Sequence, residues 1–163
     1  MIRAIVLWPD PVLSEVCAPV AQIDAATRTL CDDLLETMYD APGRGLAAPQ
    51  VGVLQRVFVM DTTWKDGERT PRVFINPEIT DRSETLVIGS EGCLSIPGLA
   101  ADVERAEAIT LRWTAPDGRI LVERLTGFDA VCAQHEFDHL EGLVIFDRVA
   151  PELRSALQAE YSQ

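Results

Sequence analysis

The two histidines of the chain, His135 and His139, lie four residues apart in the segment HEFDH, and Glu136 directly follows the first. In an α-helix, residues at i and i+4 lie on one face, so both imidazoles can reach the same metal ion. A carboxylate beside the first ligand can accept a proton from a water that the metal activates. This short pattern indicates a catalytic metal centre, but it also occurs by chance in buried helices.

A catalytic tetrahedral site takes three protein ligands and keeps one position open. Cys93 is the candidate for the third ligand, because it lies in the segment EGCLSIPG at 91–98 and a thiolate binds metals. One thiolate with two imidazoles suits both iron and zinc. Cys17, Cys31 and Cys132 have no Cys-x-x-Cys partner, and we interpret them as small buried side chains.

A helix over residues 127–141 must position the histidines. Thr126 and Asp129 resemble a capping box at its start, and Gly142 is expected to end it. One stripe of this helix is mainly apolar, which predicts that both histidines face the interior. That stripe comprises Phe128, Val131, Cys132, His135 and His139.

The remaining elements predict an α+β fold. Residues 1–22 should be mostly loop, because prolines interrupt them. A helix over 24–41 should begin at Asp24 and end before Pro42, with Asp32, Asp33 and Glu36 on its solvent side. Strands are predicted at 55–61, 72–76 and 84–89, with a strand end at Asn76-Pro77. Residues 101–125 are predicted to form a β-hairpin or meander, with strands at 108–113 and 119–123 and a turn at 115–118, and a short helix is predicted at 151–161. We expect a single domain over residues 1–163, with antiparallel or mixed β-sheets packed around the central metal-binding helix.

Composition excludes several function classes. The chain has 163 residues, is 47% hydrophobic and carries a net charge of −12. An acidic surface does not suit direct DNA binding or anionic membranes. No apolar run approaches the roughly 20 residues of a membrane span, and the N-terminus lacks a signal-peptide pattern. We therefore expect a cytoplasmic protein.

The segment GRGLAAPQ at 43–50 consists mainly of small residues. Glycine and alanine allow another backbone, such as a bound peptide, to approach closely. The segment lacks the Lys-Ser/Thr of a phosphate-binding loop. A tight turn into a buried strand is the alternative interpretation. Gln50 is notable because its amide can both donate and accept hydrogen bonds in an apolar setting.

Three segments, at 43–50, 91–95 and 134–142, resemble in order and spacing the motifs of bacterial-type peptide deformylases. The resemblance implies a hydrolase that removes the N-formyl group from the N-terminal formyl-methionine of nascent polypeptides and releases formate. It also implies one divalent metal ion held by Cys93, His135 and His139. This would be Fe²⁺ in the cell, with Zn²⁺, Ni²⁺ or Co²⁺ found after isolation. The ribosome near the exit tunnel is an expected partner.

The same resemblance suggests roles for other residues. Glu136 matches the general acid/base, and the Gln50 side chain and the Leu94 backbone N–H match the oxyanion donors. The positions expected to contact the substrate are Arg44, Gly45, Gly92 and Arg105. Arg44 departs from the family pattern, which has an aliphatic residue there, so it either extends along the bound peptide or is a solvated turn residue.

Charged neighbours of the ligands have two interpretations. Glu91 and Asp138 can orient an imidazole or bind an arginine such as Arg105, and Asp138 can equally be a solvated surface residue.

Two other functions remain open at this stage. A zincin-type peptidase shares the His-Glu-x-x-His helix, but its third ligand is usually a downstream His or Glu, and the chain has no third histidine. A catalytically divergent, deformylase-like binding protein is the second alternative. The sequence leaves open the native metal, the peptide preference, the oligomeric state and the presence of a second deformylase in the same cell.

Overall fold

The computed structural model describes residues 1–162, and Gln163, the last residue of the expected domain, lies outside the described residues. Over the described range the chain forms three α-helices and seven β-strands, and both sheets are antiparallel, which confirms the α+β class. In chain order the elements are η1 (Pro11–Ser14), α1 (Ala25–Asp40), β1 (Gly45–Ala47), η2 (Ala48–Val51), β2 (Val57–Met60), β3 (Arg72–Arg82), β4 (Leu86–Cys93), β5 (Ile96–Ala106), β6 (Ala108–Thr114), β7 (Ile120–Thr126), α2 (Gly127–Leu140), η3 (Ile145–Arg148) and α3 (Pro151–Tyr161).

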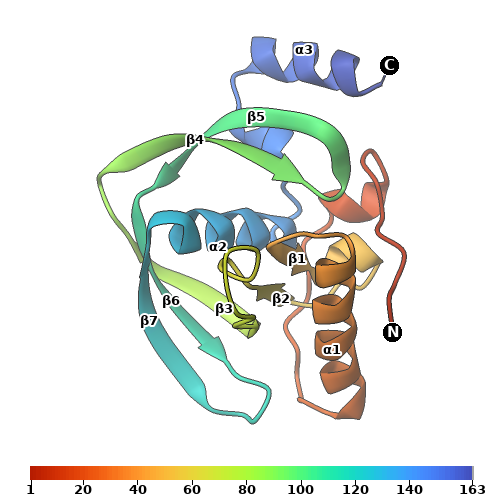
Figure 1. Ribbon diagram of the computed structural model, residues 1–163, viewed down its shortest axis with the longest axis vertical. Helices are drawn as coiled ribbons and strands as arrows, with labels where there is room; N and C mark the ends of the chain where they lie inside the picture. Colours follow the sequence, from red (N-terminus) through yellow and green to blue (C-terminus); the bar gives the residue numbers. More distant parts are fainter. Residues whose placement is uncertain (163) are drawn as a thin grey trace.

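The strands form a five-stranded sheet in the order β1-β2-β3-β6-β7 and a separate two-stranded sheet, β4-β5. Helix α2 contacts strands of both sheets (Figure 1). Among the described residues, no helix combines the length and the apolar character that crossing a bilayer requires.

Three clusters of buried apolar side chains hold these elements together. One joins the large sheet to α2 and includes Phe58, Phe74 and Trp113. The second packs α1 against strands β1 to β3. The third joins β5 to η3 and α3 and includes Phe146. Each fully buried large apolar side chain stabilises the fold by roughly 1.5–3 kcal/mol, so α2 is anchored mainly by packing.

Helix α1 begins where its sequence predicts, since the Asp24 carboxylate accepts a hydrogen bond from the Thr27 backbone N–H at 2.9 Å. The expectation that Asp33 faces solvent is wrong, because its residue is only 3% exposed. The N-terminal arm covers it, and the Met1 amine and the Arg3 guanidinium both pair with its carboxylate. A charged residue at a buried helix position is thus satisfied by a distant segment.

Helix α2 differs from the prediction at its N-terminus and agrees with it at its C-terminus. The Thr126 side chain makes no capping hydrogen bond, and Asp129 instead accepts one from the Thr62 hydroxyl. Phe128 is 53% exposed rather than buried. The helix ends at Leu140, and Gly142 follows with a φ of +76°, where a Cβ would lie 2.7 Å from the Ser14 carbonyl oxygen.

The strand pattern needs two corrections. Asn76-Pro77 does not end a strand, because β3 continues to Arg82 through a register shift between Ile75 and Glu78. Asn76 adopts a φ of +51°, and its side chain bonds the backbone N–H and carbonyl of Val20. The second correction is β5, which begins at Ile96 and so starts before the hairpin or meander predicted for residues 101–125.

Candidate metal centre and adjoining cavity

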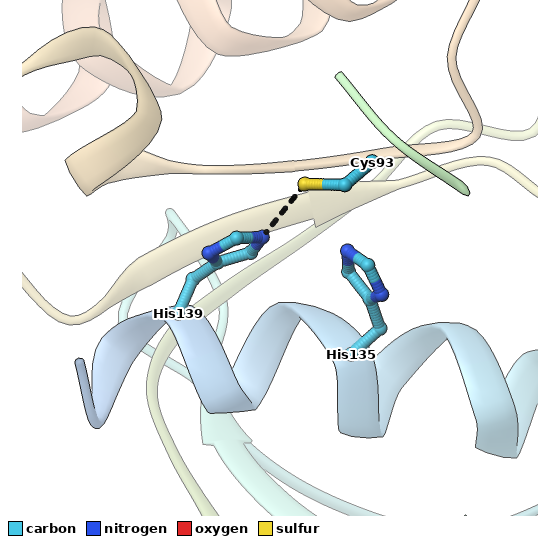
Figure 2. Close-up of side chains that lie close together, drawn as sticks. All are labelled: Cys93, His135 and His139. Atoms are coloured by element: carbon cyan, nitrogen blue, oxygen red, sulfur yellow. Dashed lines mark hydrogen bonds between the residues drawn. The ribbon is translucent and has the colours of Figure 1, made fainter. Parts of the chain in front are cut away.

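Cys93, His135 and His139 come together as the sequence predicts. Their ligand atoms all lie within 4.8 Å of one another, and the Cys93 Sγ is 3.5 Å from the His139 Nε2. Figure 2 shows both imidazoles rising from α2 toward the sulfur, which comes from the end of β4. The three side chains therefore converge on one point from a helix and a hairpin.

A local irregularity places the thiol. The β4-β5 register shifts between Gly92 and Cys93, and a two-residue turn at Leu94 and Ser95 follows. The backbone N–H of Trp8 donates to the Ser95 carbonyl at 2.9 Å, which ties this turn to the N-terminal arm. Such a bulge re-aims the side chains beside it.

Gln50 lies beside the cluster with its amide held in one orientation. Its Oε1 accepts from the Ala47 backbone N–H at 3.0 Å, and its Nε2 donates to the Ser95 Oγ at 3.1 Å. The same Nε2 is 3.7 Å from the Cys93 sulfur. Because the oxygen is engaged elsewhere, the NH₂ group is the part of the amide that faces the cluster.

A buried ionic network orients His135. The His135 Nδ1 is 2.9 Å from the Glu91 Oε1, and Arg105 donates two hydrogen bonds to Glu91, at 2.9 Å each. Arg105 also donates to Asp138 at 2.6 Å, and Arg148 binds the same carboxylate. Partners of this kind fix the orientation and tautomer of a metal-binding imidazole.

The protonation states of the cysteines suit metal binding by Cys93. Burial alone would raise the pKa of the Cys93 thiol. The imidazoles of His139 and His135 have the larger, opposite effect and hold that pKa well below its ordinary value. Burial raises the pKa of Cys17 and of Cys31 to about 11. Burial also raises the pKa of Cys132 well above its ordinary value, so Cys93 is the thiol that is available as a thiolate and the other three are packing residues.

Glu136 completes the arrangement. Burial raises the pKa of its carboxyl group, and its Oε2 lies against Gly45. Its Oε1 is buried and has no hydrogen-bond partner within residues 1–162. A buried polar atom without a partner is costly, so water or a ligand in the site would satisfy it. Together with the thiolate and imidazole donors, this oxygen fits a site for a divalent ion and a reacting water.

A cavity of about 550 Å³ adjoins the cluster and is lined by Arg44, Gly45, Gln50, Gly92 and Leu94, among others. All of these are residues that the sequence places at the site. Arg105 does not line this cavity, because it is buried between Glu91 and Asp138. It therefore belongs to the support of His135 and not to the cavity wall.

Three residues near the cavity were not predicted from the sequence. The Ser95 hydroxyl binds the Gln50 amide, Lys65 lines the cavity, and the Trp64 Nε1 donates to the Gly43 carbonyl at 2.9 Å. Ser95 belongs to the segment at 91–95, so its position two residues after Cys93 could have indicated that it lies near the site. Trp64 and Lys65 lie outside every motif in the sequence, and their neighbouring residues give no indication that they lie near the site.

Comparison with known proteins settles the family. The sequence model of the Polypeptide deformylase family matches residues 2–155. The chain belongs to the polypeptide deformylase family. A peptide deformylase of Alkalilimnicola ehrlichii is 54% identical over 94% of this chain and 85% of its own length. One from Rhizobium meliloti is 48% identical over 91% of this chain and 86% of its own.

Solved deformylase structures agree with this assignment. The fold of a peptide deformylase from Legionella pneumophila matches with a TM-score of 0.92 at 36% identity, covering 99% of this chain and 94% of that one. The Ehrlichia chaffeensis peptide deformylase in complex with actinonin matches with a TM-score of 0.91 at 35% identity, covering 98% and 95%.

Proposed function

We propose that this deformylase-family chain removes the N-formyl group from the N-terminal formyl-methionine of nascent polypeptides and releases formate. The single observation that carries the proposal is the convergence of Cys93, His135 and His139 beside the Glu136 carboxylate, next to an open cavity. The family assignment supplies the reaction class.

Cys93, His135 and His139 would hold one divalent ion, with α2 as the central metal-binding helix of a single domain. We propose Fe²⁺ as the ion in the cell, with Zn²⁺, Ni²⁺ or Co²⁺ able to occupy the site on isolation, because this donor set suits several first-row metals. When bound, the ion supplies Lewis-acid activation of water and of the formyl carbonyl.

Glu136 would move the protons of the reaction. Its carboxylate is placed to take a proton from the attacking water, which adds to the formyl carbon. The resulting carboxylic acid then returns the proton to the departing amine nitrogen, so that the carbon–nitrogen bond breaks and a free N-terminus results. Burial raises the pKa of this carboxyl group toward neutral pH, which suits both the uptake and the return of the proton.

Gln50 and Leu94 would stabilise the negative charge that develops on the formyl oxygen. The Gln50 Nε2 faces the cluster because its Oε1 is bound by the Ala47 N–H. The Leu94 backbone N–H follows Cys93 directly, in the turn that lines the cavity. Each well-placed donor contributes roughly 3–4 kcal/mol to the transition state.

The peptide would lie along the backbones of residues 43–45 and 90–92, which line the cavity on two sides. Gly45 and Gly92 leave room for a second chain to approach, and Arg44 adds a side chain at the same place. Arg105 acts as a positioning residue, through Glu91 and His135. Because the substrate is a nascent chain, we propose action in the cytoplasm, near the ribosomal exit tunnel.

The direct test is anaerobic purification, metal analysis, and measurement of formate release from formyl-Met-Ala-Ser. We expect about one metal ion per chain and metal-dependent turnover. Glu136→Gln should retain the metal and lower kcat roughly 10²- to 10⁴-fold. Cleavage of an internal peptide bond without formate release would favour a zincin-type peptidase. Full biological activity of Glu136→Gln in cells would favour a binding protein.

A further inference from the structure

Two cations at the cavity are unused by the proposed reaction. Arg44 lies in the glycine-rich segment, and Lys65, the only lysine of the chain, lies in the loop between β2 and β3. Both line the cavity. The chain has 14 basic and 26 acidic residues, so two cations on one cavity without a carboxylate partner require a physical explanation.

Neither cation forms an ion pair with a carboxylate in the described part of the chain. Each lies near an aromatic ring instead. The Arg44 guanidinium is 5.6 Å from the centroid of the half-exposed Phe128 ring, and the Lys65 Nζ is 5.7 Å from the Trp64 ring. A cation–π contact at an exposed site restrains the side chain but leaves its charge available to a ligand.

The loop that carries Lys65 is fixed to the segment that carries Arg44. The Trp64 Nε1 donates to the carbonyl of Gly43, the residue directly before Arg44, at 2.9 Å. Buried Asp61, at the start of the loop, accepts a hydrogen bond from the Thr70 backbone N–H at the end of the loop at 2.7 Å, and one from the Tyr39 hydroxyl of α1 at 2.6 Å. The backbones that carry Arg44 and Lys65 are therefore fixed relative to one another beside the cavity.

The carboxylates nearest to Arg44 and Lys65 are engaged elsewhere or form no ion pair with them in the described part of the chain. Glu91 is the acidic residue that lines the cavity, and Arg105 and His135 both bind its carboxylate. Asp129, next to Phe128, accepts a hydrogen bond from the Thr62 hydroxyl and forms no ion pair with Arg44 among the described residues. Asp66 and Glu68, in the loop of Lys65, are exposed and form no ion pair with it within residues 1–162. Cations at the wall of a cavity attract ligands of the opposite charge.

We propose that Arg44 and Lys65 give this enzyme a preference for formyl-methionyl peptides with aspartate or glutamate among the first two residues after the formyl-methionine. The inference rests on the proposed deformylase function and adds a substrate class to it. Since both cations are partly or fully solvated, the preference is modest and depends on ionic strength. The favoured acidic peptides would gain about fivefold in kcat/KM over matched basic ones at low salt.

The test compares matched peptides on the metal-loaded enzyme. The pairs are formyl-Met-Asp-Ser with formyl-Met-Lys-Ser, and formyl-Met-Ala-Asp with formyl-Met-Ala-Lys, and formate release gives kcat/KM for each. The acidic-to-basic ratio should be about fivefold and should approach one at about 0.5 M salt. Arg44→Gln and Lys65→Gln should each lower the ratio, and Lys65→Glu should lower it further.

Arg124→Gln is the matched control, because it removes the same charge from an exposed site on β7 outside the cavity. Its acidic-to-basic ratio should equal that of the unmodified enzyme. Equal rates on all four peptides, or a ratio that survives both Gln substitutions, would overturn the preference and leave the deformylase function intact. Absence of formate from every peptide, including formyl-Met-Ala-Ser, would overturn both.

Discussion

The carboxylate of Glu136 lies directly against the Cα of Gly45, so that a Cβ at this glycine would fall 2.5 Å from the Glu136 Oε2. Gly45 belongs to β1 and Glu136 to α2, and this contact joins the proposed substrate strand to the proposed proton carrier. The glycine is therefore required by the neighbouring carboxylate and not by its own backbone conformation.

Gly45→Ala should displace the Glu136 carboxylate. We expect kcat for formate release to fall by about 10²-fold or more, because a misplaced acid/base group loses most of its effect. Metal content should remain unchanged. Steady-state kinetics with metal analysis checks this. Gly89→Ala is the control, since nothing lies within 4 Å of a Cβ at that site. A fully active Gly45→Ala enzyme would show that the contact is unimportant.

Arg105→Gln should destabilise the protein strongly. It would leave the buried carboxylates of Glu91 and Asp138 with one partner fewer, and breaking a buried ion pair costs about 3–5 kcal/mol. His135 would lose its fixed support, and metal affinity should fall roughly tenfold or more. Urea unfolding and competition with a chelator measure the two effects.

Arg112→Gln is the matched comparison for Arg105→Gln. Its pair with Glu78 is exposed, with side chains 48% and 63% accessible, so its loss should cost under about 1 kcal/mol. Equal losses of stability in the two variants would contradict the importance assigned to the buried network.

Cys93→Ser should weaken metal binding sharply. The environment lowers the pKa of this thiol and favours the thiolate, whereas a serine hydroxyl stays protonated and binds these metals poorly. After dialysis, metal per chain should fall well below that of the unmodified protein. Cys31→Ala, at a buried thiol within the α1 core, should retain its metal. Equal metal content in all three proteins would remove Cys93 from the ligand set.

Asp61 should make stability dependent on acid pH. Burial alone would raise its pKa, but hydrogen bonds from Tyr39 and Thr70 hold the pKa below its ordinary value. A carboxyl group with a lowered folded-state pKa stabilises the fold above the unfolded value of about 3.9, and this contribution is lost as pH falls through the folded-state pKa.

Asp61→Asn should therefore cost about 1–3 kcal/mol at neutral pH, and the cost should shrink as the solution becomes strongly acidic. Urea unfolding across pH measures the difference. The exposed Asp66→Asn variant should stay within about 0.5 kcal/mol at every pH. A cost for Asp61→Asn that is constant with pH would refute this account of Asp61.

Local signals predicted the parts of the fold that depend on local chemistry. Asp24 and Pro42 bound α1 because a cap and a helix breaker act over a few residues. The histidines are buried as the helical stripe predicts. The start of β5 was not predicted, because Pro97 and Gly98 interrupt the strand pattern there, although Leu99, Ala101 and Val103 alternate toward the interior.

Long-range contacts account for most of what the sequence did not predict. Asp33 is buried because the N-terminal arm folds over it, and Arg105 is buried because two distant carboxylates bind it. Neither fact follows from neighbouring residues. Lys65 lines the cavity from a loop that the Trp64 Nε1 ties to the Gly43 carbonyl. Motifs thus identified the reacting groups, and tertiary structure was needed to find those that support them.

The thiol and the second imidazole of the proposed metal site are separated by 46 positions along the chain and belong to a hairpin and a helix with different packing neighbours. A bound ion would therefore join two distant segments in the native state, and its binding would stabilise that state because the unfolded chain lacks the assembled site. Chelation should shorten the lifetime of the native protein as well as stop turnover. The half-life against proteolysis would then be a measure of how firmly the ion is kept.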